Sequence, residues 1–391
     1  MHDFDKVIDR RGTDSAKWDT FDKIYSDVKG LIHMGCADSD FESPKEIIDE
    51  LNKTVNHGVF GYTDLSDEFY NGIISWQKER NNIDVKREEI VFCPRINISC
   101  GLCVEAFSQK GDEILINSPV YPPLKDAVVL NDRVIKEIPL VLQGDSFIFD
   151  FDALENAITE KTKMFILVSP HNPTSRVWTK EELEKIADIC VKHNIILYVD
   201  EIHSDLLKCG VKFTSSLAIK GLIENNLIMT HSVAKTFNVP GAIISYLIIR
   251  NKKLRDALQA QINRIGMNNP SIFANAIMRV AFQKCAYYVE EVKAYIDANE
   301  EYFKKELQKI FPKAKFIKRE GTYLLFVSFK DVAPEDKIFD FFLKKARVEF
   351  YRGSHFGKDF EGYMRINIAT PRKTLCEAIT RIKENLKYLE V

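Results

Sequence analysis

The sequence has no excess of charge of either sign and no long apolar run. Its 391 residues include 55 Lys and Arg against 57 Asp and Glu, which gives a formal net charge of -2. A nucleic-acid-binding protein would carry a basic excess, so no nucleic-acid partner is predicted. No segment reaches the roughly 18 apolar residues of a membrane span, and residues 1–6 do not begin a signal peptide. We therefore expect a cytoplasmic protein with no membrane partner.

Closely spaced cysteines are also scarce. The eight cysteines are scattered along the chain, which favours reduced thiols over a disulfide framework. Only Cys100 and Cys103 are close together. A redox or zinc role for them would need a thioredoxin-like helix start or a second CxxC pair, and neither is present. The favoured interpretation is two buried residues on a helix face, and no metal site is predicted.

Short apolar runs alternate with amphipathic helices in the middle of the chain. The runs are too short and too rich in β-branched residues for core helices, and they predict buried strands at 89–92, 113–116, 164–168, 195–199, 227–229 and 242–249. Between two of them, apolar residues at helical spacing over 183–190 follow a capping signal at 179–182. Repeated strand–helix–strand units predict a mostly parallel sheet covered on both faces.

The pattern changes after residue 250. Helices dominate, including a long charged one over roughly 286–311, and then strands near 322–327 and 363–368 precede a closing helix. We predict an α/β fold with a large domain, built on a doubly wound and mostly parallel sheet, and a smaller α+β domain. The expected boundaries are 50–280 for the large domain and 281–391 for the small domain, which residues 1–49 join.

Three polar residues follow predicted strands of the large sheet. Asn172 comes after the strand that ends at Val168, Asp200 directly ends the next strand, and Lys235 follows the strand at 227–229. Ligands of open α/β sheets bind outside the carboxyl ends of the strands. An amide, a carboxylate and a primary amine are therefore expected to gather at one place.

These residue types are the ones that pyridoxal phosphate (PLP) chemistry requires. A lysine holds the cofactor aldehyde as an imine, and a carboxylate keeps the ring nitrogen protonated, so that the ring can accept an electron pair. Lys235 and Asp200 fit these roles, and Asn172 can donate to the ring's phenolate oxygen. Ser232 offers a hydroxyl to the phosphate, and backbone amides at the helix start after Arg95 offer more donors.

Two other interpretations of Lys235 are disfavoured by the sequence. The Ser-x-x-Lys spacing also occurs at the serine nucleophile of penicillin-recognising enzymes, but their SDN and KTG elements are absent here. An ordinary surface lysine is disfavoured by the preceding strand, by Phe237-Asn238 and by the expected pairing with Asp200.

Several motifs resemble those of fold-type-I PLP enzymes, and more specifically the MalY/PatB group of cystathionine β-lyases, also called cysteine-S-conjugate β-lyases. The similarity extends over nearly the whole chain. The motifs are His57-Gly-Val-Phe-Gly-Tyr62, Pro170-His-Asn-Pro173, Asp200-Glu-Ile-His203, Ser232-x-x-Lys235-Thr-Phe-Asn238 and Gly362-Tyr-x-Arg-Ile-Asn367.

The resemblance implies a role for each candidate residue at the cofactor. Lys235 would form the imine, Asp200 would pair with the ring nitrogen and Asn172 would donate to the ring oxygen. Tyr121 would stack on the ring face, as an aromatic side chain can, although plain core packing stays open. His203 would lie near the phenolate oxygen, with a structural histidine as the alternative.

The resemblance also implies how the phosphate and the substrate are bound. The amides of Ile96 and Asn97 would meet the phosphate together with Ser232, and Tyr62 would reach the phosphate of a second chain, so a homodimer is expected. Arg365 would bind the substrate α-carboxylate through two points, which a lysine cannot do. The backbone of Ala37 would face the same carboxylate.

The chain departs from the family pattern at several positions. The family usually has Trp where this chain has Gly35, Gly where it has Ser175 and Ser where it has Ala234. Gly-Val-Val-Pro is usual where this chain has 95–98. We expect Gly35 to enlarge or reshape the substrate side of the site.

The resemblance implies a PLP-dependent C–S β-lyase that cleaves cystathionine or a related cysteine thioether to a thiol, pyruvate and ammonia. The main alternative is an amino-acid aminotransferase, which uses the same cofactor residues. A PLP-binding regulatory module is a further alternative, but one that binds DNA would need a helix-turn-helix and a basic patch. The similarity begins within the first few residues and leaves no room for such a motif.

Overall fold

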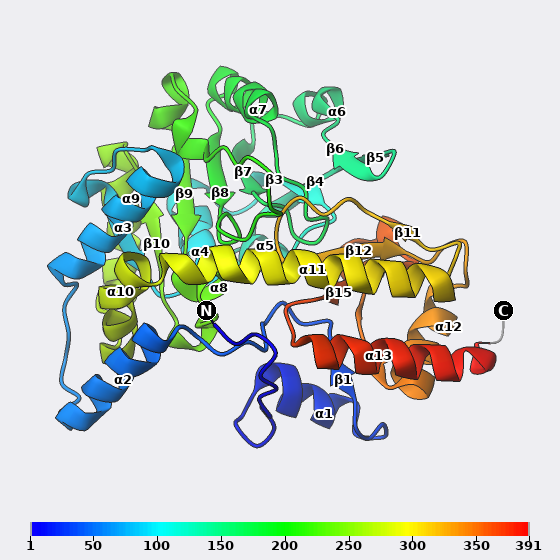
Figure 1. Cartoon of the computed structure of the whole chain (residues 1–391). Coiled ribbons are helices and arrows are strands. Elements are labelled where there is room, and N and C mark those ends of the chain that lie inside the picture. The colour runs from blue at the N-terminus through cyan, green and yellow to red at the C-terminus, as the bar shows by residue number, and fades with distance from the viewer. Residues whose placement is uncertain (1, 390–391) are drawn as a thin grey trace.

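The structure is a computed structural model that describes residues 2–389, and its centre is a seven-stranded sheet (Figure 1). The strand order is β2-β10-β9-β8-β7-β3-β4, with β3, β4, β7, β8 and β9 parallel and β10 antiparallel to both of its neighbours. This arrangement confirms the predicted α/β fold with a mostly parallel sheet. The strands are β2 (Ile90–Cys93), β3 (Glu113–Ser118), β4 (Val134–Pro139), β7 (Thr162–Val168), β8 (Ile196–Asp200), β9 (Leu227–His231) and β10 (Ser245–Ile248).

Helices cover both faces of this sheet, and the strands bury side chains on both sides. Along β3, Ile114 and Ile116 belong to one apolar core, whereas Leu115 belongs to the other, because successive side chains of a strand point to opposite faces. Cys100 and Cys103 are buried free thiols in α4, as predicted. The helices of this part are α2 (Lys45–His57), α3 (Asp67–Asn81), α4 (Ile96–Phe107), α5 (Pro122–Val129), α6 (Phe151–Asn156), α7 (Lys180–Lys192), α8 (Val233–Thr236), α9 (Lys252–Arg264) and α10 (Ile272–Lys284).

Local sequence explains where α7 begins. The Thr179 side chain accepts from the Glu182 amide, and the Glu182 side chain accepts from the Thr179 amide. This reciprocal capping box satisfies two donors that have no partner within the helix. The capping signal in the sequence is therefore confirmed.

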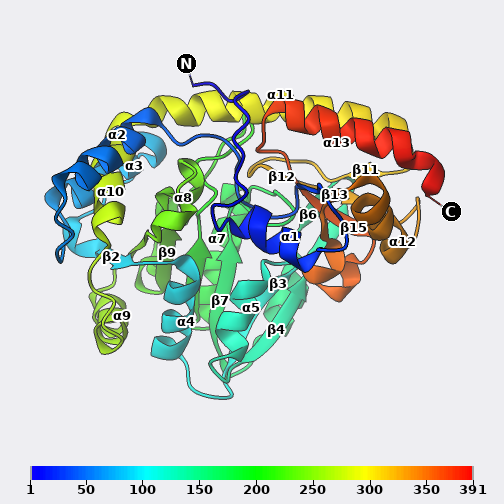
Figure 2. The same cartoon turned by 90° about the horizontal axis from the view of Figure 1, so that it is seen from below.

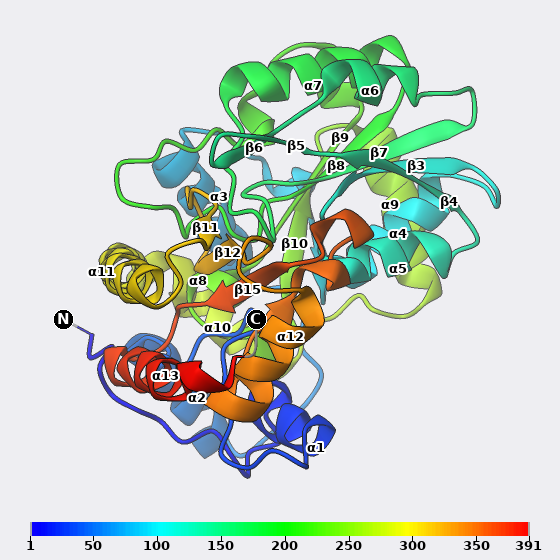
Figure 3. The same ribbon diagram turned by 90° about the vertical axis from the view of Figure 1, so that its right-hand side faces the viewer.

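A second, antiparallel sheet lies beside the first, with the order β11-β12-β15-β14. Figure 2 shows α11 (Ala286–Ile310) extending from the α10 side of the large sheet to α13 (Arg372–Asn385) beside the small one. In Figure 3, α13 lies on the opposite side of β15 from α6 and α7. The other elements here are β11 (Lys315–Phe316), β12 (Leu324–Ser328), α12 (Glu335–Asp340), β14 (Tyr351–Arg352) and β15 (Tyr363–Asn367).

The N-terminal segment also contacts this smaller part. β1 (Ile32–His33) pairs in parallel with β13 (Val348–Glu349), and the Asp40 amide donates to the Ala369 carbonyl. The remaining elements are α1 (Phe21–Ile24) and the hairpin β5 (Val141–Gln143) and β6 (Ser146–Ile148). The exact domain boundaries stay a prediction. Within residues 2–389, no helix combines the length and the apolarity needed to cross a membrane.

Candidate active site

Three neighbouring strands end at the same edge of the large sheet. β7 pairs with β8 and β8 with β9, all in parallel, so their carboxyl ends lie side by side. Asp200 is the last residue of β8, Asn172 lies in the loop after β7, and Lys235 lies in α8 directly after β9. The structure therefore places the predicted amide, carboxylate and amine at one rim.

Lys235 is held at this rim by its short helix. The Ser232 hydroxyl accepts from the Ala234 amide at 3.0 Å, which caps α8. The Lys235 ammonium Nζ donates to the Ala37 carbonyl at 2.5 Å, across 198 residues of sequence. Burial lowers the pKa of this amine below its ordinary value, and the nearby Arg365 charge acts in the same direction. An amine that loses its proton more readily is better suited to act as a nucleophile or a base.

Asp200 is buried, with 5% of its surface exposed. Its Oδ1 accepts from the Ile202 amide at 3.0 Å. Burial raises the pKa of this carboxyl to about 6, against the opposing influence of that hydrogen bond and of the His231 and Lys235 side chains. A buried acid with a raised pKa is stabilised in its charged form by a cation placed next to it.

Arg365 on β15 is buried and forms no ion pair with an acidic side chain of residues 2–389. Its Nη1 donates to Asn172 Oδ1 at 3.0 Å and its Nη2 to the Gly35 carbonyl at 2.7 Å, and its Nε has no hydrogen-bond partner among the described residues. Burial lowers the pKa of the guanidinium. The guanidinium thus links the small sheet to Asn172 and keeps a donor free for an anion.

Other predicted residues surround the three central ones. Tyr121 follows β3 and directly precedes α5, and burial raises the pKa of its phenol, an effect that an interaction with the Asn97 side chain opposes. The His203 ring is buried, and its centroid lies 5.8 Å from that of the Tyr323 ring. Burial lowers the pKa of His203 to about 3. His203 Nδ1 has no partner among the described residues, so the neutral ring keeps one nitrogen available.

The start of α4 offers backbone donors. Ile96 and Asn97 are its first two residues, and they precede the first turn-closing hydrogen bond, from the Ser99 amide to the Arg95 carbonyl. Amides at this position have no acceptor within the helix and can bind an anion. Ser232, in contrast, already uses its hydroxyl as the α8 cap and as a donor to the Ile244 carbonyl at 2.5 Å.

Tyr62 is fully exposed in the loop between α2 and α3, together with Val59 and Phe60. Its side chain is therefore not packed within its own chain. An apolar pocket of about 600 Å³ lies on the same side of the molecule, and Val55 and Phe273 line part of it. Phe273 also contacts Phe60, with ring centroids 6.0 Å apart, so the pocket and the exposed loop adjoin each other.

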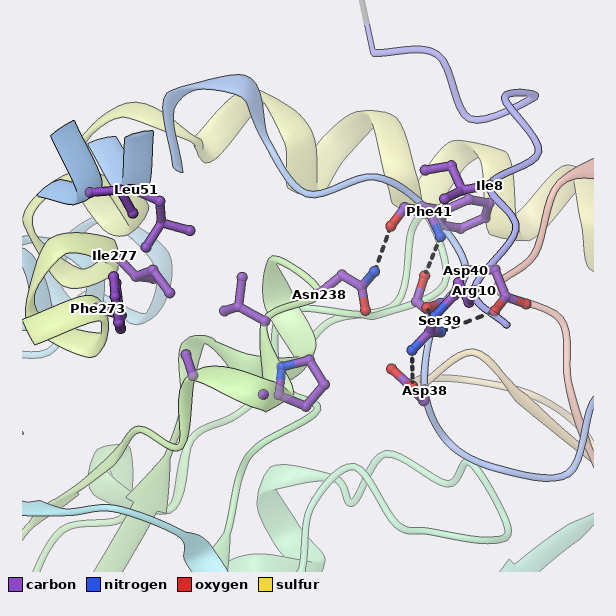
Figure 4. A pocket seen from close by; sticks show the side chains of 15 residues that line it. Ile8, Arg10, Asp38, Ser39, Asp40, Phe41, Leu51, Asn238, Phe273 and Ile277 are labelled. Carbon is purple, nitrogen blue, oxygen red and sulfur yellow. Dashed lines mark hydrogen bonds and ion pairs between the residues drawn. The ribbon is translucent and has the colours of Figure 1, made fainter. Parts of the chain in front are cut away.

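Figure 4 shows that this pocket borders the segment that follows α8, the helix that carries Lys235. Asn238, three residues after Lys235, points toward Phe41 and donates to its carbonyl at 2.5 Å. Arg10 forms ion pairs with Asp38 and Asp40 at 2.6 and 3.1 Å on the other side. These contacts fix the N-terminal segment, including Ala37, over the site.

The structure also identifies site residues that sequence reasoning missed. The Tyr323 hydroxyl donates to the Ala37 carbonyl at 2.9 Å, and no pattern in the sequence indicates this. Asp205 accepts from the Thr236 hydroxyl at 2.7 Å and from Trp76 Nε1 at 3.0 Å, and its Oδ2 lies 3.3 Å from His231 Nε2. Thr236 follows Lys235 in the Ser232-x-x-Lys235-Thr-Phe-Asn238 motif, and this motif was the only sequence feature that could have pointed to the contact with Asp205. Through these hydrogen bonds Asp205 anchors α8.

Of the two effects expected of Gly35, enlargement of the site was wrong, whereas a changed shape of its substrate side stays a prediction. A Cβ at this position would lie 2.3 Å from Glu349 Oε1 and 2.4 Å from Tyr351 Cδ1. The space beside Gly35 is therefore already filled by side chains from β13 and β14. Glycine is required there by this close approach.

Comparisons with known proteins agree with this geometry. The family described as "Aminotransferase class I and II" matches residues 29–382. Cystathionine beta-lyase PatB of Bacillus subtilis is 31% identical over 385 residues, 98% of this chain and 99% of that protein. Two solved structures that contain PLP are also similar, each with a TM-score of 0.95. A Clostridium difficile 630 protein is 33% identical, and the match covers 99% of this chain and 100% of that one. Cystalysin from Treponema denticola is 29% identical, and the match covers 100% of both chains.

Proposed function

Because the chain belongs to the aminotransferase class I and II family, whose solved relatives contain PLP, we propose that it is a PLP-dependent C–S β-lyase. Its substrate would be cystathionine or a related cysteine thioether, and its products a thiol, pyruvate and ammonia. The observation that carries the proposal is the convergence of Lys235, Asp200 and Arg365 on one rim, each with a charge that burial disfavours.

The residues present fit PLP as the cofactor. Asp200 needs a cation beside it to favour its charged form, and a protonated ring nitrogen is such a cation. Lys235 has the lowered pKa that an amine needs to hold an aldehyde. Bound PLP supplies a cationic ring that accepts the electron pair released when a bond to the substrate α-carbon breaks. Tyr121 would cover the ring face, and Asn172 and His203 would lie near its phenolate oxygen.

Arg365 would orient the substrate. Its unpartnered Nε and its neighbouring Nη atoms can bind an α-carboxylate at two points, and the Ala37 amide would face the same group. A fixed carboxylate sets the direction of the α-carbon–hydrogen bond, and such orientation contributes several powers of ten to a rate. The Lys235 amine would then take the α-proton, and departure of the thiolate from the β-carbon would follow.

The phosphate would lie at the start of α4. The amides of Ile96 and Asn97 point outward from a helix N-terminus, where the helix dipole favours an anion. Ser232 would need to redirect its hydroxyl from the Ile244 carbonyl to add a third donor.

A homodimer would complete this part of the site. The Tyr62 side chain is fully exposed among the described residues of its own chain, and the loop that carries it adjoins the apolar pocket of Figure 4. An exposed apolar surface of this kind is typical of an interface. We propose that Tyr62 reaches the phosphate of the second chain, so that each site contains residues from both.

Transamination is the second candidate, favoured by the name of the matched family. Both reactions use Lys235, Asp200 and Arg365 in the same way up to removal of the α-proton. Purified protein incubated with cystathionine should release pyruvate and a free thiol without added keto acid, and a Lys235→Ala variant should release neither. Amine transfer that depends on a keto acid, without thiol release, would instead favour the aminotransferase.

A further inference from the structure

A buried acid lies behind the arginine of the site. The parallel pairing of β1 with β13 sets His33 beside Glu349, and both side chains are almost completely buried. Glu349 Oε2 accepts from the Gly35 amide at 3.1 Å and lies 3.8 Å from His33 Nδ1. His33 Nε2 lies 2.8 Å from Asp22 Oδ1. The imidazole therefore lies between two carboxylates, and only the contact with Asp22 is within hydrogen-bond distance.

The backbone of Gly35 connects this acid to Arg365. Its amide donates to Glu349, and its carbonyl accepts from Arg365 Nη2 at 2.7 Å. The N–H and the C=O of Gly35 belong to two successive peptide planes that meet at its Cα. Hydrogen bonds on both sides therefore restrict the φ and ψ angles of a residue that has no side chain to limit them. Loss of the Glu349 contact would leave the buried Gly35 amide unpaired and free the carbonyl to turn away from Arg365.

Packing fixes the other side of the guanidinium. The Arg365 guanidinium carbon lies 4.8 Å from the Tyr351 ring and 4.7 Å from the Phe356 ring. Tyr351 and Glu349 also fill the space where Gly35 would carry a Cβ. Glycine, acid and tyrosine thus form one closely packed wall behind the guanidinium.

We propose that Glu349 is a positioning residue for the α-carboxylate site, acting on Arg365 through the backbone of Gly35. This inference rests on the proposed function, because it presupposes that Arg365 binds the substrate carboxylate. Glu349 acts as a hydrogen-bond acceptor, so the oxygen of an amide can replace it.

The test compares two ligands of the PLP-loaded enzyme that differ only in a carboxylate, L-alanine and ethylamine. Their dissociation constants are measured from the absorbance change of the bound cofactor. Glu349→Ala should weaken L-alanine binding about tenfold and leave ethylamine binding within about twofold, since a misdirected guanidinium affects only the carboxylate. Glu349→Gln should keep both constants within about threefold of the wild type.

Glu335→Ala is the matched control. Glu335 is also buried and accepts from a glycine amide, that of Gly362, at 2.5 Å. Its removal should not change the ratio of the two dissociation constants. Gly35→Ala provides a second perturbation if Glu349→Ala does not fold, because the new methyl group would displace Glu349 and Tyr351. It should weaken L-alanine binding selectively as well.

The outcomes separate two failures. If the wild type does not favour L-alanine over ethylamine, Arg365 has no role in carboxylate binding, and the inference is overturned with that part of the proposed function. If the wild type favours L-alanine and neither Glu349→Ala nor Gly35→Ala changes the ratio, the inference alone is overturned. An equal loss for both ligands would assign Glu349 a merely structural role, and an equally large selective loss in Glu349→Gln would rule out the acceptor mechanism.

Discussion

Replacement of Asp200 by asparagine should stabilise the cofactor-free protein in a pH-dependent way. Burial raises the pKa of this carboxyl from 3.8 to about 6, a change of about two units. At about 1.4 kcal/mol per unit, the ionised carboxylate destabilises the folded state by about 3 kcal/mol. Asparagine keeps an oxygen that can accept from the Ile202 amide, so Asp200→Asn removes the charge and retains the hydrogen bond.

The sign of the effect follows from the two pKa values. Near pH 4 the folded protein holds a protonated Asp200, and the carboxyl affects stability little. As the pH rises from about 4 to about 6, the carboxyl ionises in the unfolded chain but stays protonated in its buried position, so the wild type loses stability that Asp200→Asn keeps, and the loss levels off above about 6. The difference in unfolding free energy should therefore grow from near zero at pH 4 to about 3 kcal/mol at pH 8.

Urea unfolding of both cofactor-free proteins, followed by tryptophan fluorescence between pH 4 and 8, measures this difference. Asp205→Asn is a control of opposite sign. Burial would raise the pKa of Asp205, but the hydrogen bonds from His231 and Thr236 outweigh it and lower the pKa. Asp205→Asn should be less stable than the wild type throughout this range. A constant difference between Asp200→Asn and the wild type would refute the reasoning.

Three further predictions concern the assembled site. Lys235→Ala should show no borohydride-trapped cofactor on the chain by mass spectrometry, whereas the wild type should carry one at residue 235. Arg365→Lys should lower kcat/KM for a thioether substrate about 100-fold, since an ammonium cannot make the two-point contact. Its cofactor content, measured by absorbance, should not change. A kcat/KM equal to that of the wild type would show that Arg365 does not bind the substrate. Mixing inactive Tyr62→Ala and Lys235→Ala chains should restore roughly a quarter of the wild-type activity. Half of the dimers would then be mixed, and one of the two sites in each mixed dimer would be intact. No recovery would mean that Tyr62 contributes to the site of its own chain.

The sequence predicted the rim of the large sheet well because local rules govern it. Short β-branched runs predicted β7, β8 and β9, and the shared direction of parallel strands places their carboxyl ends at one edge of the sheet. Asn172, Asp200 and Lys235 could therefore be grouped without a structure. The run at 242–249 also gave a strand, but its antiparallel pairing with β9 and β2 was not predicted, since periodicity does not report strand direction.

Local sequence patterns could not predict contacts between segments that lie far apart in the chain. The resemblance pointed to Arg365 and Ala37, yet nothing in the sequence indicated that Ala37 would accept from Lys235 or that Gly35 would accept from Arg365 across 330 residues. The enlargement expected at Gly35 was wrong for the same reason. A missing side chain indicates space only if no neighbour fills it, and the neighbours, Glu349 and Tyr351, lie more than 300 positions away.

The site concentrates charges that the protein alone leaves uncompensated. Burial raises the pKa of Asp200 and lowers those of Lys235 and Arg365, so each group is pushed toward its neutral form. A chain selected only for stability would pair or remove such groups, because a lone buried charge is strongly unfavourable. In the proposed function, each would be relieved by a different part of one ligand set: a ring cation beside Asp200, an aldehyde at Lys235 and a carboxylate at Arg365. Because the three groups come from β8, α8 and β15, the ligands would also join the large sheet to the small one, and loss of the cofactor should loosen the contact between them.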